Sequence, residues 1–188
     1  VALVTCTLGE EGEVLVADLA HIGVNGEDRL GDHRINELGD AMKVLGVADW
    51  RLLGEPGKYR DSGMMGEPSN NREGCFWQTD LLAAAEDLVP VIRSQRPHVL
   101  ITYDDFGGYG HPDHIQAHRT AMYASQLAAA PTFRPDLGEA WDVPKIYWTA
   151  ISKSMIRAGI EALRASGDTS EMAMMDPDEI PFGVDDEL

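Results

Sequence analysis

One stretch of this sequence decides the fold: His98-Val-Leu-Ile-Thr-Tyr103, then Asp104-Asp-Phe-Gly-Gly-Tyr-Gly110, then His111-Pro-Asp-His114. The first part is an apolar, β-branched run typical of a buried strand. The second part is a glycine-rich loop. The third begins a helix, because proline is favoured at the first helical position, where its missing N–H would be unpaired anyway. We therefore expect a strand, a loop and a helix, with His111 at the helix cap.

Histidines gather at the start of this expected helix. Three of the chain's six histidines lie within residues 111–118, beside a carboxylate. His114 and His118 are four residues apart, so they share a helix face and could both bind a metal. A catalytic zinc site has three protein ligands, imidazoles and carboxylates among them, and an open position for water. The alternative is that the histidines only cap the helix and hydrogen-bond one another.

Working outward, strands and helices alternate along the chain. Strands are expected over 1–5, 50–53 and 145–151, and helices over 28–45, 79–94 and 154–165. This alternation predicts an α/β fold with one mostly parallel, Rossmann-like sheet and helices on both of its faces. With 188 residues, 44% of them hydrophobic, the chain suffices for one domain. The site is expected at the carboxyl ends of the strands.

Three further segments carry charge. Glu10, Glu11 and Glu13 follow the first strand and are candidate site residues, with a solvated acidic turn as the alternative. The long loop over 54–74 could close over a polar substrate or be a plain surface loop. From Asp168 onward there are eight acidic residues and no Lys or Arg. We expect residues 168–188 to form a solvated or unpaired acidic tail.

Composition and motifs exclude several classes of function. A net charge of -17 argues against nucleic acid as a partner, because such binding relies on clustered Lys and Arg. The two cysteines lie far apart, which predicts no disulfide framework and favours a reducing cytoplasm. No apolar run is long enough for a membrane span. The glycines lack the GxGxxG spacing of dinucleotide-binding proteins, and no GxSxG marks a serine nucleophile. Hydrolysis at a metal remains.

Four motifs together resemble the LmbE/PIG-L-like zinc-dependent N-deacetylases. They are Gly108-Tyr-Gly-His-Pro-Asp-His114, Thr5-Cys-Thr-Leu-Gly-Glu-Glu-Gly-Glu-Val14, Arg60-Asp-Ser-Gly-Met64 and Arg96-Pro-His-Val99. The resemblance extends over essentially the whole chain. Within the family it is greatest to the enzymes that deacetylate N-acetylglucosaminyl-inositol in mycothiol biosynthesis. It implies an LmbE-like fold, a Zn²⁺ cofactor with Fe²⁺ as the alternative, and a small pseudodisaccharide substrate.

The resemblance also implies roles for the central residues. His114 matches a histidine that binds the metal. His111 matches a non-ligand histidine that, as imidazolium, stabilises the tetrahedral oxyanion and protonates the leaving amine. Asp113 matches the carboxylate that orients this histidine, and Tyr109 matches a mobile tyrosine that helps to polarise the substrate carbonyl. His118 has no ligand role in this scheme, contrary to the inference from spacing.

Three more positions match residues of the family's sugar or inositol pocket, namely Arg34, Asp61 and Glu13. One family motif is missing, however. No His-Pro-Asp-Asp occurs in the 188 residues, although in the family it supplies a histidine and an aspartate to the metal, and the general base. The family places it on the strand before the one that starts at Val1. We therefore expect a chain truncated at both ends, and nearly inactive by itself.

Three hypotheses about function follow. The first is an intact parent that deacetylates N-acetylglucosaminyl-inositol. The second keeps the chemistry but has a mycothiol S-conjugate as the substrate. The third is a catalytically inactive sugar-binding module that has lost half of the site.

Overall fold

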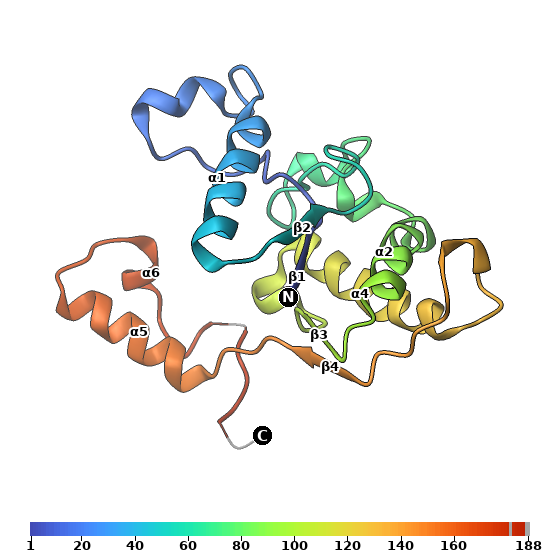
Figure 1. Cartoon of the computed structure of the whole chain (residues 1–188). Coiled ribbons are helices and arrows are strands. Elements are labelled where there is room, and N and C mark those ends of the chain that lie inside the picture. Colours follow the sequence, from blue (N-terminus) through green and yellow to red (C-terminus); the bar gives the residue numbers. More distant parts are fainter. Residues whose placement is uncertain (181, 187–188) are drawn as a thin grey trace.

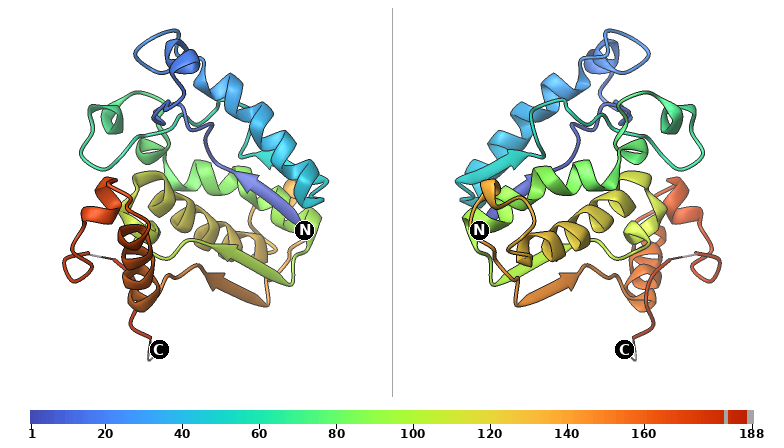
Figure 2. Two further views of the ribbon diagram at one scale, coloured as in Figure 1. Left: turned by 90° about the vertical axis from the view of Figure 1, so that its left-hand side faces the viewer. Right: turned by 90° about the vertical axis from the view of Figure 1, so that its right-hand side faces the viewer.

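The computed structural model describes residues 1–180 and 182–186 (Figure 1). These residues form four short strands: β1 (Ala2–Thr5), β2 (Asp49–Leu52), β3 (Val99–Thr102) and β4 (Lys145–Trp148). β1 pairs with β2 in parallel, with Leu3 opposite Trp50, and β3 pairs with β4, with Ile101 opposite Tyr147. Figure 2 shows the arrows of β1, β3 and β4 running in the same direction. The predicted α/β class with parallel strands is confirmed.

The single predicted sheet is instead two separate strand pairs. β1–β2 and β3–β4 are not hydrogen-bonded to each other. Between them lies a cleft of about 1290 Å³, which all four residues of β1 and all four of β3 help to line. Each of these strands is paired on one side only, so its other edge is available at the cleft.

Helices surround these strands. The long ones are α1 (Leu30–Leu45), α2 (Leu81–Gln95), α4 (Pro112–Ala129) and α5 (Lys153–Ala165). The short ones are α3 (Gly107–Gly110), α6 (Glu171–Met174) and the 3₁₀ helices η1 (Ala17–Ile22), η2 (Pro68–Asn71), η3 (Phe76–Gln78) and η4 (Pro135–Leu137). The predicted boundaries hold to within two residues, except that β4 ends at Trp148, three residues before the predicted end at 151. Gly46 ends α1 in the left-handed conformation, as its position predicts. None of the helices in the described ranges is long and apolar enough to cross a membrane.

The core lies where α2 packs against α4. Small residues, such as Ala85 of α2 and Ala124 and Ala128 of α4, are fully buried and let the two helices approach closely. Leu100 of β3 and Ile146 of β4 pack against this cluster. The buried interface holds α4, whose first turn carries the histidines, against the strands.

The expectation of helices on both faces holds for only one strand pair. Val4 of β1 packs with α2, while Trp50 of β2 lies against α1 at Gly39, on the opposite face. The outer face of β3–β4 is bare among the described residues. Ile101, for example, is 69% exposed on it.

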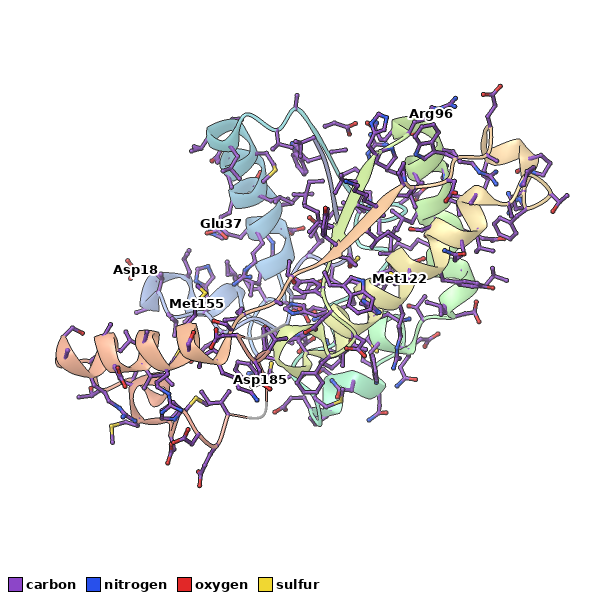
Figure 3. The ribbon with its side chains drawn as sticks, turned by 90° about the horizontal axis from the view of Figure 1, so that it is seen from below. Asp18, Glu37, Arg96, Met122, Met155 and Asp185 are labelled. Carbon is purple, nitrogen blue, oxygen red and sulfur yellow. The ribbon has the colours of Figure 1, made fainter. Side chains whose placement is uncertain are left out.

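The acidic tail is not the unpaired end that its composition predicts. Its described residues fold back onto α5, where Arg157 pairs with Asp178 and Lys153 Nζ lies 2.9 Å from Asp185. Val184 exchanges backbone hydrogen bonds with the segment just before α5. Figure 3 shows Asp185 beside the start of α5. Carboxylates distant in sequence thus find the basic residues of α5, a pairing that composition alone cannot reveal.

Candidate active site

The site forms where β3 leads into α4. Gly107, Gly108 and Gly110 all have positive φ, which lets the chain turn tightly after β3. Pro112 occupies the first position of α4, and His111 is the N-cap, its Nδ1 accepting a hydrogen bond of 3.1 Å from the Asp113 N–H. The predicted strand, loop, helix and cap are therefore confirmed.

His114 is held by its ring nitrogen Nδ1. This atom lies 3.1 Å from the carbonyl oxygen of Gly107. The ring of Tyr103 stacks on the imidazole with centroids 4.1 Å apart and planes within 6°. A carbonyl oxygen only accepts hydrogen bonds, so Nδ1 carries the proton and Nε2 keeps its lone pair.

His111 and His114 form a stacked pair. Their ring centroids are 4.7 Å apart with planes at 26°, and Tyr109 meets the edge of the His114 ring at 5.1 Å. Burial lowers the pKa of His111, and the neighbouring His114 lowers it further, while Asp61 opposes the shift. Burial also lowers the pKa of His114. Both imidazoles therefore favour the neutral form at neutral pH.

Asp113 turns its carboxylate away from His111. Oδ2 accepts a hydrogen bond of 2.9 Å from the Ser62 N–H, and Oδ1 is buried without a partner among the described residues. Burial raises the pKa of Asp113 to about 7, and the adjacent Asp61 carboxyl contributes to the rise. The backbone N–H of Asp113, and not its carboxylate, contacts the His111 ring. Orientation of His111 by this carboxylate stays a prediction.

The loop over 60–63 completes the floor of the site. Both carboxylate oxygens of Asp61 accept backbone N–H groups, from Gly63 at 2.9 Å and from Glu11 at 3.2 Å. In return the Glu10 carboxylate accepts the Asp61 N–H at 3.0 Å. These reciprocal bonds fasten the loop after β1 to the loop that carries Asp61.

Arg34 lies on the other side of the loop after β1. A Cβ atom added to Gly12 would lie 3.2 Å from Arg34 Nη2, and one at Gly9 would lie 3.1 Å from Nη1. The guanidinium therefore rests on the glycines of this loop. Arg34, Asp113 and His114 all line the cleft between β1 and β3.

A protein-family model matches the part of the sequence that forms this site. It is described as "PIG-L: GlcNAc-PI de-N-acetylase" and matches residues 1–125, which include the loop after β1, the Asp61 loop and His111-Pro-Asp-His114.

The chain belongs to the PIG-L family.

Curated PIG-L relatives resemble it closely. The 1D-myo-inositol 2-acetamido-2-deoxy-alpha-D-glucopyranoside deacetylase of Kribbella flavida is 59% identical over 185 residues, which cover 95% of this chain and 61% of that protein. The enzyme of the same name from Geodermatophilus obscurus is 57% identical over 189 residues, covering 100% of this chain and 64% of that protein. The chain thus spans about three fifths of the length of these relatives.

One solved structure supports the fold. GalB, the 4-carboxy-2-hydroxymuconate hydratase from Pseudomonas putida KT2440, aligns with a TM-score of 0.54 at 19% identity, covering 89% of this chain and 77% of that one. At this level of identity the likeness concerns the fold alone.

The structure brings most of the predicted PIG-L site residues together. Tyr109 at the end of α3 and His111, Asp113 and His114 at the start of α4 lie together, and the Asp61 carboxyl lies beside that of Asp113. Glu13 is the exception. It is exposed, and no contact in the described structure joins it to the other site residues. Its place in the pocket stays a prediction.

Sequence reasoning missed Ser62 and Phe182, and it misassigned Glu10 and Glu11. These two are neither free site carboxylates nor a solvated turn, because Glu10 Oε2 accepts backbone N–H groups and Glu11 Oε1 accepts hydrogen bonds from two arginines. Ser62 places Asp113 through its N–H. Phe182 comes from the far end of the chain, with its ring 6.4 Å from that of Tyr109. The Arg60-Asp-Ser-Gly-Met64 motif was a signal for Ser62; nothing local marked the others.

His118 lies away from the other two histidines. Its Nδ1 is 2.9 Å from the carbonyl oxygen of Tyr103, and its ring meets Trp148 edge-on at 5.0 Å. These contacts place it in the packing between α4, β3 and β4, as the resemblance implies.

A metal ion fits His114 but needs ligands from elsewhere. Its Nε2 is free, and the Gly107 carbonyl on Nδ1 is the kind of outer partner that metal-binding histidines have. Within residues 1–180 and 182–186, however, no three His, Cys, Asp or Glu side chains are grouped to hold a metal. The described residues thus supply fewer than three ligands.

Proposed function

We propose that this chain forms one side of a zinc-dependent N-deacetylase site that removes the acetyl group from N-acetylglucosaminyl-inositol. The observation that carries this proposal is the pair of imidazoles at the start of α4. His114 donates from Nδ1 to a carbonyl oxygen and has no partner on Nε2 among the described residues, and His111, stacked against it, accepts a backbone N–H with its own Nδ1. The relatives with that activity in their names, at 57–59% identity, support the choice of substrate.

His114 is the metal ligand in this proposal. Zinc, when bound, supplies a Lewis acid and a water molecule whose pKa is lowered towards neutrality. The remaining ligands and the general base would come from a His-Pro-Asp-Asp motif on an additional strand. The cleft between β1 and β3 supports that placement, because both strands offer an unpaired edge there, and Asp113 and His114 lie along it.

His111 is the oxyanion donor in this proposal. Its Nδ1 accepts the Asp113 N–H, so the proton of the neutral ring is on Nε2. That N–H can donate to the oxygen that becomes negative as the tetrahedral intermediate forms. Protonation of Nδ1 would break the helix cap, and burial lowers the pKa of the ring. The geometry therefore favours oxyanion stabilisation over protonation of the leaving amine.

The substrate hydroxyls would be held by Arg34, Asp61 and Glu13. Arg34 offers a forked donor above the glycines of the loop after β1. Each Asp61 oxygen accepts one backbone N–H and keeps a second lone pair for a hydroxyl. Tyr109, which is 46% exposed, is placed to close over the acetamide and polarise its carbonyl. We also place the protein in the cytoplasm, a setting that suits its two free cysteines.

The test is acetate release by the full-length gene product. The protein is loaded with Zn²⁺ or, separately, Fe²⁺, and offered N-acetylglucosaminyl-inositol or a mycothiol S-conjugate. We expect zinc-dependent acetate release, with a higher kcat/KM than for amide cleavage of the S-conjugate. Faster cleavage of the S-conjugate would show that the S-conjugate, and not N-acetylglucosaminyl-inositol, is the preferred substrate. If the protein bound the sugar but did not hydrolyse it with either metal, the result would favour a sugar-binding module over an enzyme.

A further inference from the structure

The His114 ring is constrained on more sides than a capping histidine needs. The Gly107 carbonyl binds its Nδ1 at 3.1 Å, Tyr103 stacks on the ring, and Tyr109 meets the ring edge with the centroids 5.1 Å apart. Helix capping at this turn is already provided by His111. The contacts on His114 therefore fix the imidazole itself.

Gly107 can approach His114 only because it has no side chain. A Cβ atom at this position would lie 2.8 Å from the Cβ of His114 and 2.8 Å from the backbone nitrogen of Ile115. Its φ of +68° is also strained for any other residue. The neighbouring Gly108 has a φ of +78°, but an added Cβ there meets nothing within 4 Å. The close approach to His114 is thus specific to Gly107.

The Gly107 carbonyl selects one tautomer. A carbonyl oxygen can only accept a hydrogen bond, so the donor must be His114 Nδ1, which therefore carries the proton. Neutral imidazole in water favours the proton on Nε2, which would point Nε2–H outward and block a metal. The proton therefore sits on the less common nitrogen, and the lone pair is aimed outward before any metal arrives.

We propose that Gly107 and Tyr103 are positioning residues that hold His114 in the Nδ1–H tautomer and in a fixed ring plane, so that Nε2 is ready to bind a metal. The value of this arrangement for metal binding rests on the proposed function. The tautomer is a property of the chain's own residues. Tyr103 acts through its ring, because the stacked geometry, with planes within 6°, restricts rotation of the imidazole.

The first experiment reads the tautomer without metal or activity. ¹⁵N-labelled full-length protein, stripped of metal, gives imidazole nitrogen shifts that separate the two tautomers, and the His114→Asn variant assigns the resonances. We expect Nδ1 to be protonated in His114. A predominantly Nε2-protonated ring would overturn the proposal, even if the enzyme proved to be a deacetylase.

The second experiment measures zinc affinity in a competition titration with a chelator. Gly107→Ala should weaken zinc binding by about 10-fold to 100-fold, as loss of an outer partner of a ligand does. Gly108→Ala is the matched control, since it places alanine at a positive φ in the same turn without touching His114, and should leave the affinity within about threefold. Equal losses in both variants would show that only loop strain matters and would overturn the role of Gly107.

A second pair of variants keeps the proposal testable if Gly107→Ala does not fold. Tyr103→Leu removes the stacked ring and should weaken zinc binding, with His114 exchanging between tautomers. Tyr103→Phe keeps the ring and should rescue both readouts. No difference between the two would overturn the role of Tyr103. If wild-type protein binds no zinc, the proposed function fails, and the tautomer measurement still decides this inference.

Discussion

Two loops of this molecule look alike in sequence and differ in structure. The loop over 8–13 follows β1 and the loop over 104–111 follows β3, and both combine glycines with ionisable residues at the carboxyl end of a parallel strand. In the first loop, Glu10 and Glu11 direct their oxygens at backbone N–H groups and at arginines. In the second, His111 and His114 each bind the backbone through Nδ1 alone.

The difference lies in what each side chain has left to offer. Glu11 is the hub of an ion network, with Oε1 3.0 Å from Arg60 Nη2 and 2.6 Å from Arg72 Nη1, and its side chain is only 10% exposed. Each imidazole, by contrast, keeps one nitrogen free. Ionisable residues at a strand end are therefore scaffold when ion pairs tie them to distant segments, and site when, as for these imidazoles, the described residues offer them no ion pair.

Removing Nε2 of His114 tests the difference between the two loops with the largest expected effect. His114→Asn keeps a donor close to the position of Nδ1, for the Gly107 carbonyl, and lacks Nε2. Turnover should fall by about 10³-fold or more, since a bound metal contributes several kcal/mol to the transition state. His118→Asn is the matched control, because His118 also binds a carbonyl through Nδ1, and should stay within about tenfold of wild type. Similar losses in both would contradict the distinction.

Removing Nε2 of His111 should have the next largest effect. His111→Asn keeps a good N-cap acceptor for the Asp113 N–H and removes Nε2–H. Turnover should drop by about 10² to 10³-fold, as for loss of one oxyanion donor, with zinc content unchanged. Initial-rate kinetics with elemental analysis check both. Turnover like that of wild type would remove His111 from the chemistry.

Substitutions in the loop over 8–13 should change the free energy of unfolding. Glu11→Gln leaves two arginines without their shared partner in a largely buried position, so the free energy of unfolding should fall by about 2 kcal/mol. Asp28→Asn removes the other carboxylate that pairs with Arg60. Because the Asp28 side chain is 43% exposed, the free energy of unfolding should fall by less than about 1 kcal/mol. Urea unfolding measures both. Equal costs would show that Glu11 is no more a scaffold than a surface charge.

A further difference between the loops concerns the pH dependence of stability. The pKa of Asp113 rises from an ordinary value of 3.8 to about 7 in the folded protein, so its contribution to stability is fully present below about pH 4 and is lost as pH rises through 7. Asp113→Asn stays neutral, and its amide oxygen can still accept the Ser62 N–H. In metal-free protein the variant should be more stable than wild type by up to about 4 kcal/mol at pH 8, and nearly equal to it at pH 4. A pH-independent difference would refute the raised pKa.

Local features of the fold were predictable from sequence. The strand after Pro97, the glycine turn, Pro112 at the first helical position and the His111 cap each depend on neighbours within a few residues. The family resemblance supplied the residue roles that spacing left open, such as the separation of His114 from His118.

Long-range features were not predictable. The bonds of Glu10 and Glu11 join segments about 50 residues apart, so composition could suggest a site or a solvated turn but not a scaffold. The separation into two strand pairs depends on which edges find partners. The return of Asp178 and Asp185 to α5 likewise depends on tertiary contacts.

The central claim is that His114, and not His118, carries the metal through Nε2. Zinc per chain in full-length protein, measured by elemental analysis after dialysis, tests it most directly. We expect close to one zinc per chain in wild type and in His118→Asn, and almost none in His114→Asn. A His114→Asn protein that keeps stoichiometric zinc would contradict it.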